Sequence, residues 1–261
     1  MPFRSTPCCR GASPKSGLRR LISQRVASQA TCMRGEYGQF CPVALASEVL
    51  AERWTLLVVR ELLAGARRFN QIRRGVPRLS GTLLKQRLQT LEYAGIVTHS
   101  SAAGGADYQL TRAGQALKPI VRSIGEWGQR WARDIEGRDL DPGWLVWSMH
   151  RRLNVAAMPP GRTVIEIEFV DAPATSRRFW LVHCDGAVDV CLKDPGFDPA
   201  VRLSTRVRTL AEVWRGIRSL RGEVRAGTVT LQGAAHYRRA LPQWLLLSAY
   251  AHIPRRPQIK P

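Results

Sequence analysis

Residues 53–62 read Arg53-Trp54-Thr55-Leu56-Leu57-Val58-Val59-Arg60-Glu61-Leu62, and they are followed by Arg68-Phe69-Asn70-Gln71-Ile72 and by Ser80-Gly81-Thr82-Leu83-Leu84-Lys85-Gln86-Arg87-Leu88-Gln89-Thr90-Leu91-Glu92. The spacing of the apolar residues predicts short amphipathic helices separated by a tight turn. Residues 53–91 hold nine Lys or Arg against one acid, Glu61, which is a local balance of +8. Such a compact basic helical unit is typical of a module that docks on a polyanion. The alternative is an ordinary solvated basic face.

The composition bounds the class of protein. The 261 residues leave room for two domains, and 44% hydrophobic with 23% charged residues is globular material. The net charge of +20 is spread as +6 over residues 1–32, +5 over 33–141 and +9 over 142–261. Because the excess is general, only the run at 53–91 supports a specific partner.

The N-terminal residues 1–32 carry six basic and no acidic side chains and show no periodicity. They predict a disordered leader, with Met33 as an alternative natural start. Apolar runs here and elsewhere are too short for a secretory signal or a membrane span. The six cysteines do not form a disulfide framework, so we expect a reducing cytoplasm.

The helix expected over Ser80–Glu92 has two different faces. Ser80 suits the N-cap, and Leu84, Leu88 and Leu91 pack inward at helical spacing. The opposite face carries polar side chains: Thr82, Lys85, Gln86 and Gln89. Gly95 ends the helix.

A β-hairpin follows, with strands at 96–99 and 108–110 around a loop at 103–105, and we call it the wing. From Thr111 the spacing predicts a long helix that reaches about Glu136. Its apolar stripe consists of Leu117, Ile120, Ile124, Trp127 and Trp131. The stripe is longer than a three-helix core can cover, which indicates a dimer interface.

The second half of the chain predicts an independent α+β domain beyond a boundary at 139–143. Strands are expected at 163–169, 179–183 and 188–192, and helices around 209–220 and 234–249, with 227–233 between the helices. The predicted division is a leader at 1–32, a helical domain at 33–138, an α+β domain at 143–254 and a tail at 255–261.

The first domain resembles the HxlR family of winged helix-turn-helix transcription regulators over about residues 38–131. The matching residues are Cys41-Pro42, Arg53-Trp54-Thr55, Arg60-Glu61-Leu62, Arg68-Phe69-Asn70, Pro77, Ser80, Leu84, Arg87-Leu88, Leu91-Glu92, Gly95-Ile96-Val97, Tyr108-Gln109-Leu110-Thr111, Gly114 and Trp127-Gly128. The resemblance implies a dimer on double-stranded operator DNA, with Ser80–Glu92 as the recognition helix. Thr82 departs from the pattern, because the family commonly has a basic residue there.

The second domain resembles a sterol-carrier-protein-like domain, which encloses an apolar tunnel in relatives that carry lipids. The similarity rests on the order of elements, on 195–199 leading into a strand, and on 210–214 followed by 227–233. It implies a ligand-sensing module. The expected fold class is therefore α+β, with a winged helix-turn-helix domain followed by a sterol-carrier-like domain.

The candidate DNA contacts are Arg68, Arg78, Ser80, Thr82, Lys85, Gln86, Arg87 and Gln89. Gln pairs with adenine and Lys with guanine in the major groove, whereas Arg78 and Arg87 suit phosphates. The wing has no basic residue at its tip and predicts a weak minor-groove reader.

Cys41 precedes Pro42 at a helix start, where the positive helix end lowers a thiol pKa. A redox switch and a buried structural thiol are both open at this point. His183, Cys184 and Cys191 match no standard metal spacing, and no metal or other cofactor is expected.

An apolar ligand cavity is expected among Trp180, Trp214, Ile217, Leu231, Trp244 and Leu245, although each also suits plain core. The sequence contains no catalytic constellation, phosphate loop or dinucleotide fingerprint, so no enzyme is expected. The sequence predicts a dimeric repressor that responds to an apolar or amphipathic effector. The alternative is a lipid or acyl carrier that the N-terminal domain only dimerises.

Overall fold

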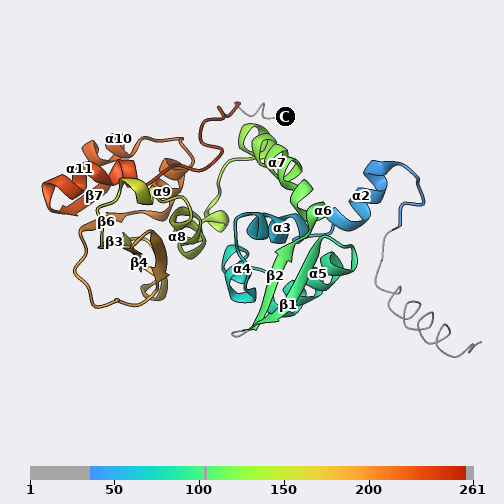
Figure 1. The fold of residues 1–261 in the computed structure, drawn as a ribbon. Helices are drawn as coiled ribbons and strands as arrows, with labels where there is room; N and C mark the ends of the chain where they lie inside the picture. The colour runs from blue at the N-terminus through green and yellow to red at the C-terminus, as the bar shows by residue number, and fades with distance from the viewer. Residues whose placement is uncertain (1–35, 103–104, 257–261) are drawn as a thin grey trace, which may run out of the picture. The chain divides into compact units, whose positions relative to one another are not determined.

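The computed structural model describes residues 36–102 and 105–256 (Figure 1). The leader expected at 1–32 and Gly104 of the wing lie outside these residues, as does most of the tail. The chain divides into two compact units at the Glu52–Arg53 bond. The expected α+β domain and most of the expected helical domain share the second unit, whereas the part of the helical domain before Arg53 belongs to the first.

The described part of the first unit is built around helix α2, Pro42–Leu50. Pro42 stands in the first turn, where its missing N–H leaves no donor unsatisfied. Tyr37 donates its backbone N–H to Glu48 at 2.9 Å. None of the α2 residues, all of them described, is buried, and Phe40 beside the helix is 99% exposed. Val43 and Leu45 of this helix are exposed, and Val49 and Leu50 are half-buried.

The second unit begins with three helices: α3 (Thr55–Leu63), α4 (Phe69–Gly75) and α5 (Gly81–Tyr93). They bury one apolar core, made of Val58, Val59, Leu62, Ile72, Leu84, Leu88 and Leu91. Ser80 is the N-cap of α5, since its hydroxyl accepts the Leu83 N–H at 3.3 Å. The cap and the inward leucines confirm the predicted helix.

The wing is confirmed as an antiparallel pair, β1 (Val97–Ala102) and β2 (Gly105–Leu110). Val97 pairs with Leu110 at its base. The long helix expected from Thr111 to about Glu136 is wrong in one respect: it is two helices, α6 (Arg112–Ala116) and α7 (Lys118–Trp131). Pro119 restarts the helix because it suits only a first turn, and Ala132 turns extended.

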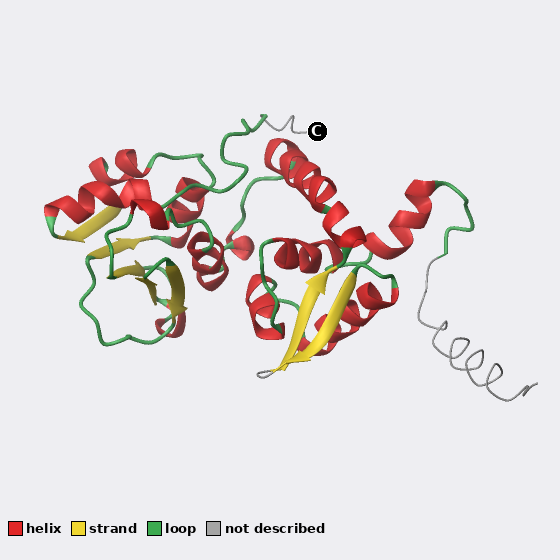
Figure 2. Ribbon diagram, viewed as in Figure 1, coloured by secondary structure: helices red, strands yellow, loops and turns green. Residues whose placement is uncertain are grey.

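The rest of the described chain forms strands and helices (Figure 2). Its five strands make one sheet in the order β5-β4-β3-β6-β7. β3 pairs parallel with β6, and the other pairs are antiparallel. The strands are β3 (Arg162–Phe169), β4 (Arg178–Cys184), β5 (Ala187–Cys191), β6 (Val201–Thr205) and β7 (Val229–Gly233). The accompanying helices are α8 (Pro142–His150), α9 (Val207–Trp214), α10 (Leu220–Arg225) and α11 (Ala235–Trp244). Short 3₁₀ turns lie at Gly137–Asp139, Val155–Ala157 and Ala174–Ser176.

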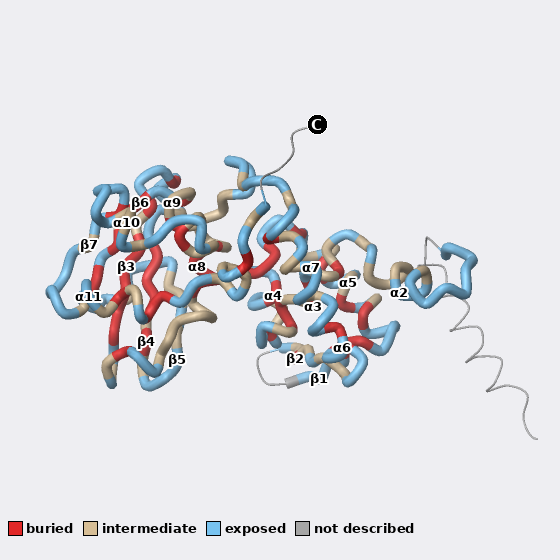
Figure 3. Tube along the Cα trace, turned by 90° about the horizontal axis from the view of Figure 1, so that it is seen from above, coloured by how far each residue is buried: buried red, intermediate tan, exposed pale blue. Residues whose placement is uncertain are grey.

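Buried residues follow the strands of this sheet (Figure 3), and the hydrophobic core lies against one of its faces. Ile165, Ile167 and Leu203 point to it and meet side chains of α8, α9 and α11, because alternate residues of a strand share a face. The other face carries ion pairs, among them Glu166 with Arg202 at 2.9 Å.

Two helices of this region differ from expectation. The helix expected at 209–220 ends at Trp214, since Gly216 adopts a φ of +74° where a further α turn cannot form, and α10 starts separately. The helix expected at 234–249 stops at Trp244, two residues after Pro242, whose ring removes one helical hydrogen bond. Helix α8 had no amphipathic signal, because five of its nine residues are buried.

Candidate functional site

The exposed face of α5 is the candidate nucleic-acid interface. Leu84, Leu88 and Leu91 are buried beneath it. The side chains that the sequence singled out on the opposite face are all exposed: Thr82, Lys85, Gln86 and Gln89. Because Ser80 caps the first turn, this polar face belongs to a helix with a defined start, as base recognition requires.

The arginines predicted beside this face also hold the protein together. Arg87 donates through Nε to the Arg53 carbonyl at 3.1 Å, which fixes the start of α3. Arg78 donates to the backbone carbonyl of Arg138. These residues therefore position the helical unit as well as supplying positive charge.

The wing is attached to α4 by two neighbouring arginines. Arg68 donates through Nη1 to the Gly105 carbonyl at 2.7 Å, and Arg67 forms an ion pair with Asp107. The hydrogen bond from Arg67 lowers the pKa of Asp107, and Gln109 adds a second one. Arg68, predicted as a DNA contact, thus sets the wing's orientation. The pairing of Arg67 with Asp107 was missed, since 40 residues separate them.

A buried carboxylate links α3 to the end of α8. Glu61 is fully buried, and its two oxygens accept from Arg60 at 2.7 Å and from Arg151 at 2.9 Å. A side chain at Gly75 would collide with it, because a Cβ there would lie 1.8 Å from Oε2. The one sequence signal was that Glu61 is the only acid at 53–91.

Cys41 lies at the N-cap position of α2 and is exposed. The backbone N–H groups of Ala44 and Val43 lower the pKa of its thiol. The alternative of a buried structural thiol does not fit this placement.

A pocket of about 640 Å³ lies beside α9 and α10. Its apolar wall includes Met149, Leu210, Val213 and the run Leu245–Leu247. Of the six cavity residues expected, Trp214, Ile217 and Leu245 line it. The others lie elsewhere: Trp244 is in the core, Leu231 packs against that core, and Trp180 pairs with Cys191 across β4 and β5.

The pocket also has a charged edge. Arg218, Arg221 and Arg225 line it, and Arg221 and Arg225 are exposed. Arg218 pairs with Glu212 at 2.5 Å and with Glu223 at 3.3 Å. Arg221 and Arg225 have no carboxylate partner among the described residues. The pocket therefore combines an apolar wall with two exposed arginines that form no ion pair among the described residues.

His183, Cys184 and Cys191 do not assemble a metal site. Within the described residues, no group of three or more His, Cys, Asp or Glu side chains is placed to hold an ion. His183 accepts the Gly186 N–H at 3.2 Å in the β4–β5 turn, so it has a structural role there.

The helices α3, α4 and α5, of which α5 is capped and has an exposed polar face, and the two-stranded wing define a winged helix-turn-helix protein. Residues 49–136 match the family model described as HxlR-like helix-turn-helix. The chain is 35% identical over 111 residues to the HTH-type transcriptional regulator YvaP of Bacillus subtilis, covering 41% of this chain and 95% of that protein. This chain belongs to the HxlR-like family and is a DNA-binding transcriptional regulator.

Other relatives carry similar descriptions. The HTH-type transcriptional regulator sll1512 of Synechocystis is 31% identical over 99 residues, covering 37% of this chain and 73% of that protein. Among solved structures, the redox regulator HypR in its reduced form is 32% identical, with a TM-score of 0.32, over 34% of this chain and 90% of HypR. None of the helices in the described ranges has the length and apolarity that a bilayer crossing needs.

Proposed function

We propose that this regulator binds a specific operator as a dimer and represses transcription, with α5 in the major groove. The observation that carries the proposal is the exposed face of Thr82, Lys85, Gln86 and Gln89 opposite the buried leucines. Lys85 and Gln89 are one helical turn apart and would reach neighbouring base edges. Ser80, Arg68, Arg78 and Arg87 would contact phosphates at the edge of this face.

Dimerisation is supported by apolar side chains that remain at least partly exposed in the single chain. On α7 they recur at helical spacing and comprise Ile120, Ile124, Trp127 and Trp131, with Trp127 63% exposed. On α2, Val43 and Leu45 are exposed as well. A partner copy would bury both helices, and two recognition helices would then face successive turns of DNA.

The α+β region, residues 143–254, would act as a sterol-carrier-like ligand domain. The mixed sheet covered on one face by helices supports this, as does the pocket of about 640 Å³, which lies in the size range of ligand sites. The apolar wall with Arg221 and Arg225 at its edge favours an amphipathic anion. Such an effector would alter operator affinity by about 1–3 kcal/mol.

Cys41 would be a second input, since an exposed thiol of lowered pKa reacts readily with oxidants or electrophiles. The rival function of a lipid carrier is not favoured, because the family and the relatives are DNA-binding regulators.

The test is a titration of a labelled duplex from the protein's own upstream region with a Lys85→Ala/Gln89→Ala variant. Losing two base contacts should weaken specific binding by about tenfold or more. The matched control is Arg239→Ala/Gln243→Ala on α11, an exposed pair with the same spacing and charge. Equal loss in both variants, or in neither, would refute α5 as the reading helix.

A further inference from the structure

The chain segment that follows α11 contacts both the pocket and helix α7. Its first residues, Leu245–Leu247, form part of the pocket wall. Its last described residues, up to Arg256, contact α7. We call residues 245–256 the strap. Nothing in the family match covers it, since that match ends at residue 136.

The pocket end of the strap is fixed by backbone contacts. Leu245 bridges to Leu153, and the Leu247 carbonyl accepts from Arg152 at 2.7 Å. The Ser248 N–H donates to the carbonyl of Trp214, another pocket residue, at 2.8 Å. A molecule that fills the pocket therefore touches the strap and the end of α9 together.

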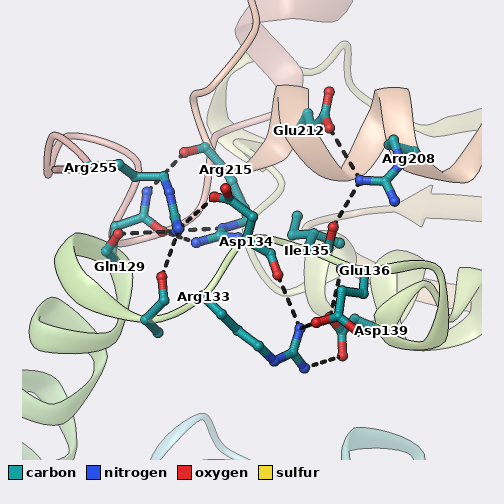
Figure 4. A network of polar contacts seen from close by, with 11 residues as sticks. Gln129, Arg133, Asp134, Ile135, Glu136, Asp139, Arg208, Glu212, Arg215 and Arg255 are labelled. Atoms are coloured by element: carbon teal, nitrogen blue, oxygen red, sulfur yellow. Dashed lines mark hydrogen bonds and ion pairs between the residues drawn. The ribbon is translucent and has the colours of Figure 1, made fainter. Parts of the chain in front are cut away.

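The C-terminal end of the strap contacts the C-terminal half of α7 (Figure 4). Arg255 donates to the carbonyls of Gln129 and Ala132 at 3.3 and 2.8 Å and pairs with Asp134 at 2.8 Å. The Arg256 guanidinium lies 4.6 Å from the ring centre of Trp131.

The Tyr250 ring closes on α7 at Gly125, where only glycine leaves room. A Cβ at Gly125 would lie 2.2 Å from Cζ of Tyr250. Beside it, Arg215, which follows Trp214, donates to the Gln129 side chain at 2.7 Å. Gln129 is buried although its helix is otherwise largely exposed. Pocket wall and α7 are thus joined by packed, directional contacts.

We propose that the strap transmits occupancy of the pocket to α7. Filling the pocket moves Leu245–Leu247, which shifts Tyr250 and Arg255 against α7. The α8 end of the domain stays anchored on α3 through Arg151 and Glu61, so the displacement falls on α7. This inference rests on the proposed function, in which the pocket receives the effector and α7 dimerises the protein.

The proposal is tested from the α7 side with two matched substitutions, Gly125→Ala and Gly128→Ala. Both add one methyl group to the same helix, but a Cβ at Gly128 has nothing within 4 Å among the described residues. Hydrogen exchange of residues 245–256 and 214–218 is measured by mass spectrometry in the full chain. We expect about fivefold faster exchange in both segments for Gly125→Ala and no change for Gly128→Ala.

The reverse direction uses Ile217→Trp, which fills the pocket at a half-exposed position without any ligand. Because coupling is reciprocal, exchange should change in residues 125–132 of α7, and Arg255→Ala should abolish that response. If each substitution changes hydrogen exchange only in the element that carries it, the proposed transmission through the strap is refuted. A protein that passes these tests but neither dimerises nor binds DNA would instead refute the proposed function.

Discussion

Replacing Arg151 by Ala should destabilise the protein strongly, because it leaves a buried carboxylate half paired. Glu61 is fully buried, and Arg151 supplies the bond to Oε2 at 2.9 Å while Arg60 serves Oε1. The Arg151 side chain is only 19% exposed, so water can reach Glu61 only poorly when the guanidinium is removed. A hydrogen bond to a charged group contributes about 1.5–3 kcal/mol, and breaking a buried pair costs about 3–5 kcal/mol.

We therefore expect a loss of about 2–4 kcal/mol in the free energy of unfolding, measured by urea denaturation followed by tryptophan fluorescence. Arg152→Ala is the matched control, because the neighbouring Arg152 makes one hydrogen bond, to the Leu247 carbonyl. Its loss should be about 1 kcal/mol. Arg151→Lys should recover part of the stability through a single bond. If Arg151→Ala unfolds like the control, the buried pair does not join α3 to α8.

Three further results are expected. Burial lowers the pKa of His150 to about 4, below the value of about 6.5 in an unfolded chain, so the free energy of unfolding should fall as pH drops from about 6.5 to about 4. His150→Gln should flatten this pH dependence of stability. An unchanged pH dependence in the variant would contradict the burial of His150. The rate at which Cys41 reacts with iodoacetamide should rise at a lower pH than for free cysteine. The Cys41 rate is obtained as the difference between wild type and Cys41→Ser. A pH–rate profile like that of free cysteine would exclude an activated thiol. Ser80→Ala should cost about 1 kcal/mol of stability through loss of the α5 cap, whereas the exposed Ser101→Ala should cost nothing measurable; equal effects would refute the cap.

The helical unit could be predicted from the sequence because its signals are local. Ser80 caps a helix whose leucines recur at helical spacing, and the wing is bounded by turn residues. The family resemblance over residues 38–131 was confirmed by a match at 49–136. The exposed polar face of α5 followed directly from that spacing.

What the sequence did not predict depends on distant contacts. Helix α8 is buried nearly all round and so lacks a period, and Arg151 meets Glu61 from 90 residues away. Trp54 adopts a φ of +80°, which no propensity indicates for a bulky side chain. Half of the expected cavity residues lie outside the pocket, because apolar side chains in strands and in α11 equally suit the core.

The most direct test of the account is the preference of the purified protein for its own upstream DNA over random duplex at two salt concentrations. If α5 reads the operator sequence, binding to the upstream DNA should be tighter than to random DNA by about 10³ or more, and this ratio should persist as salt rises. Equal affinity for both duplexes, collapsing together with salt, would mean that the net charge of +20 acts alone. That result would contradict sequence reading by α5.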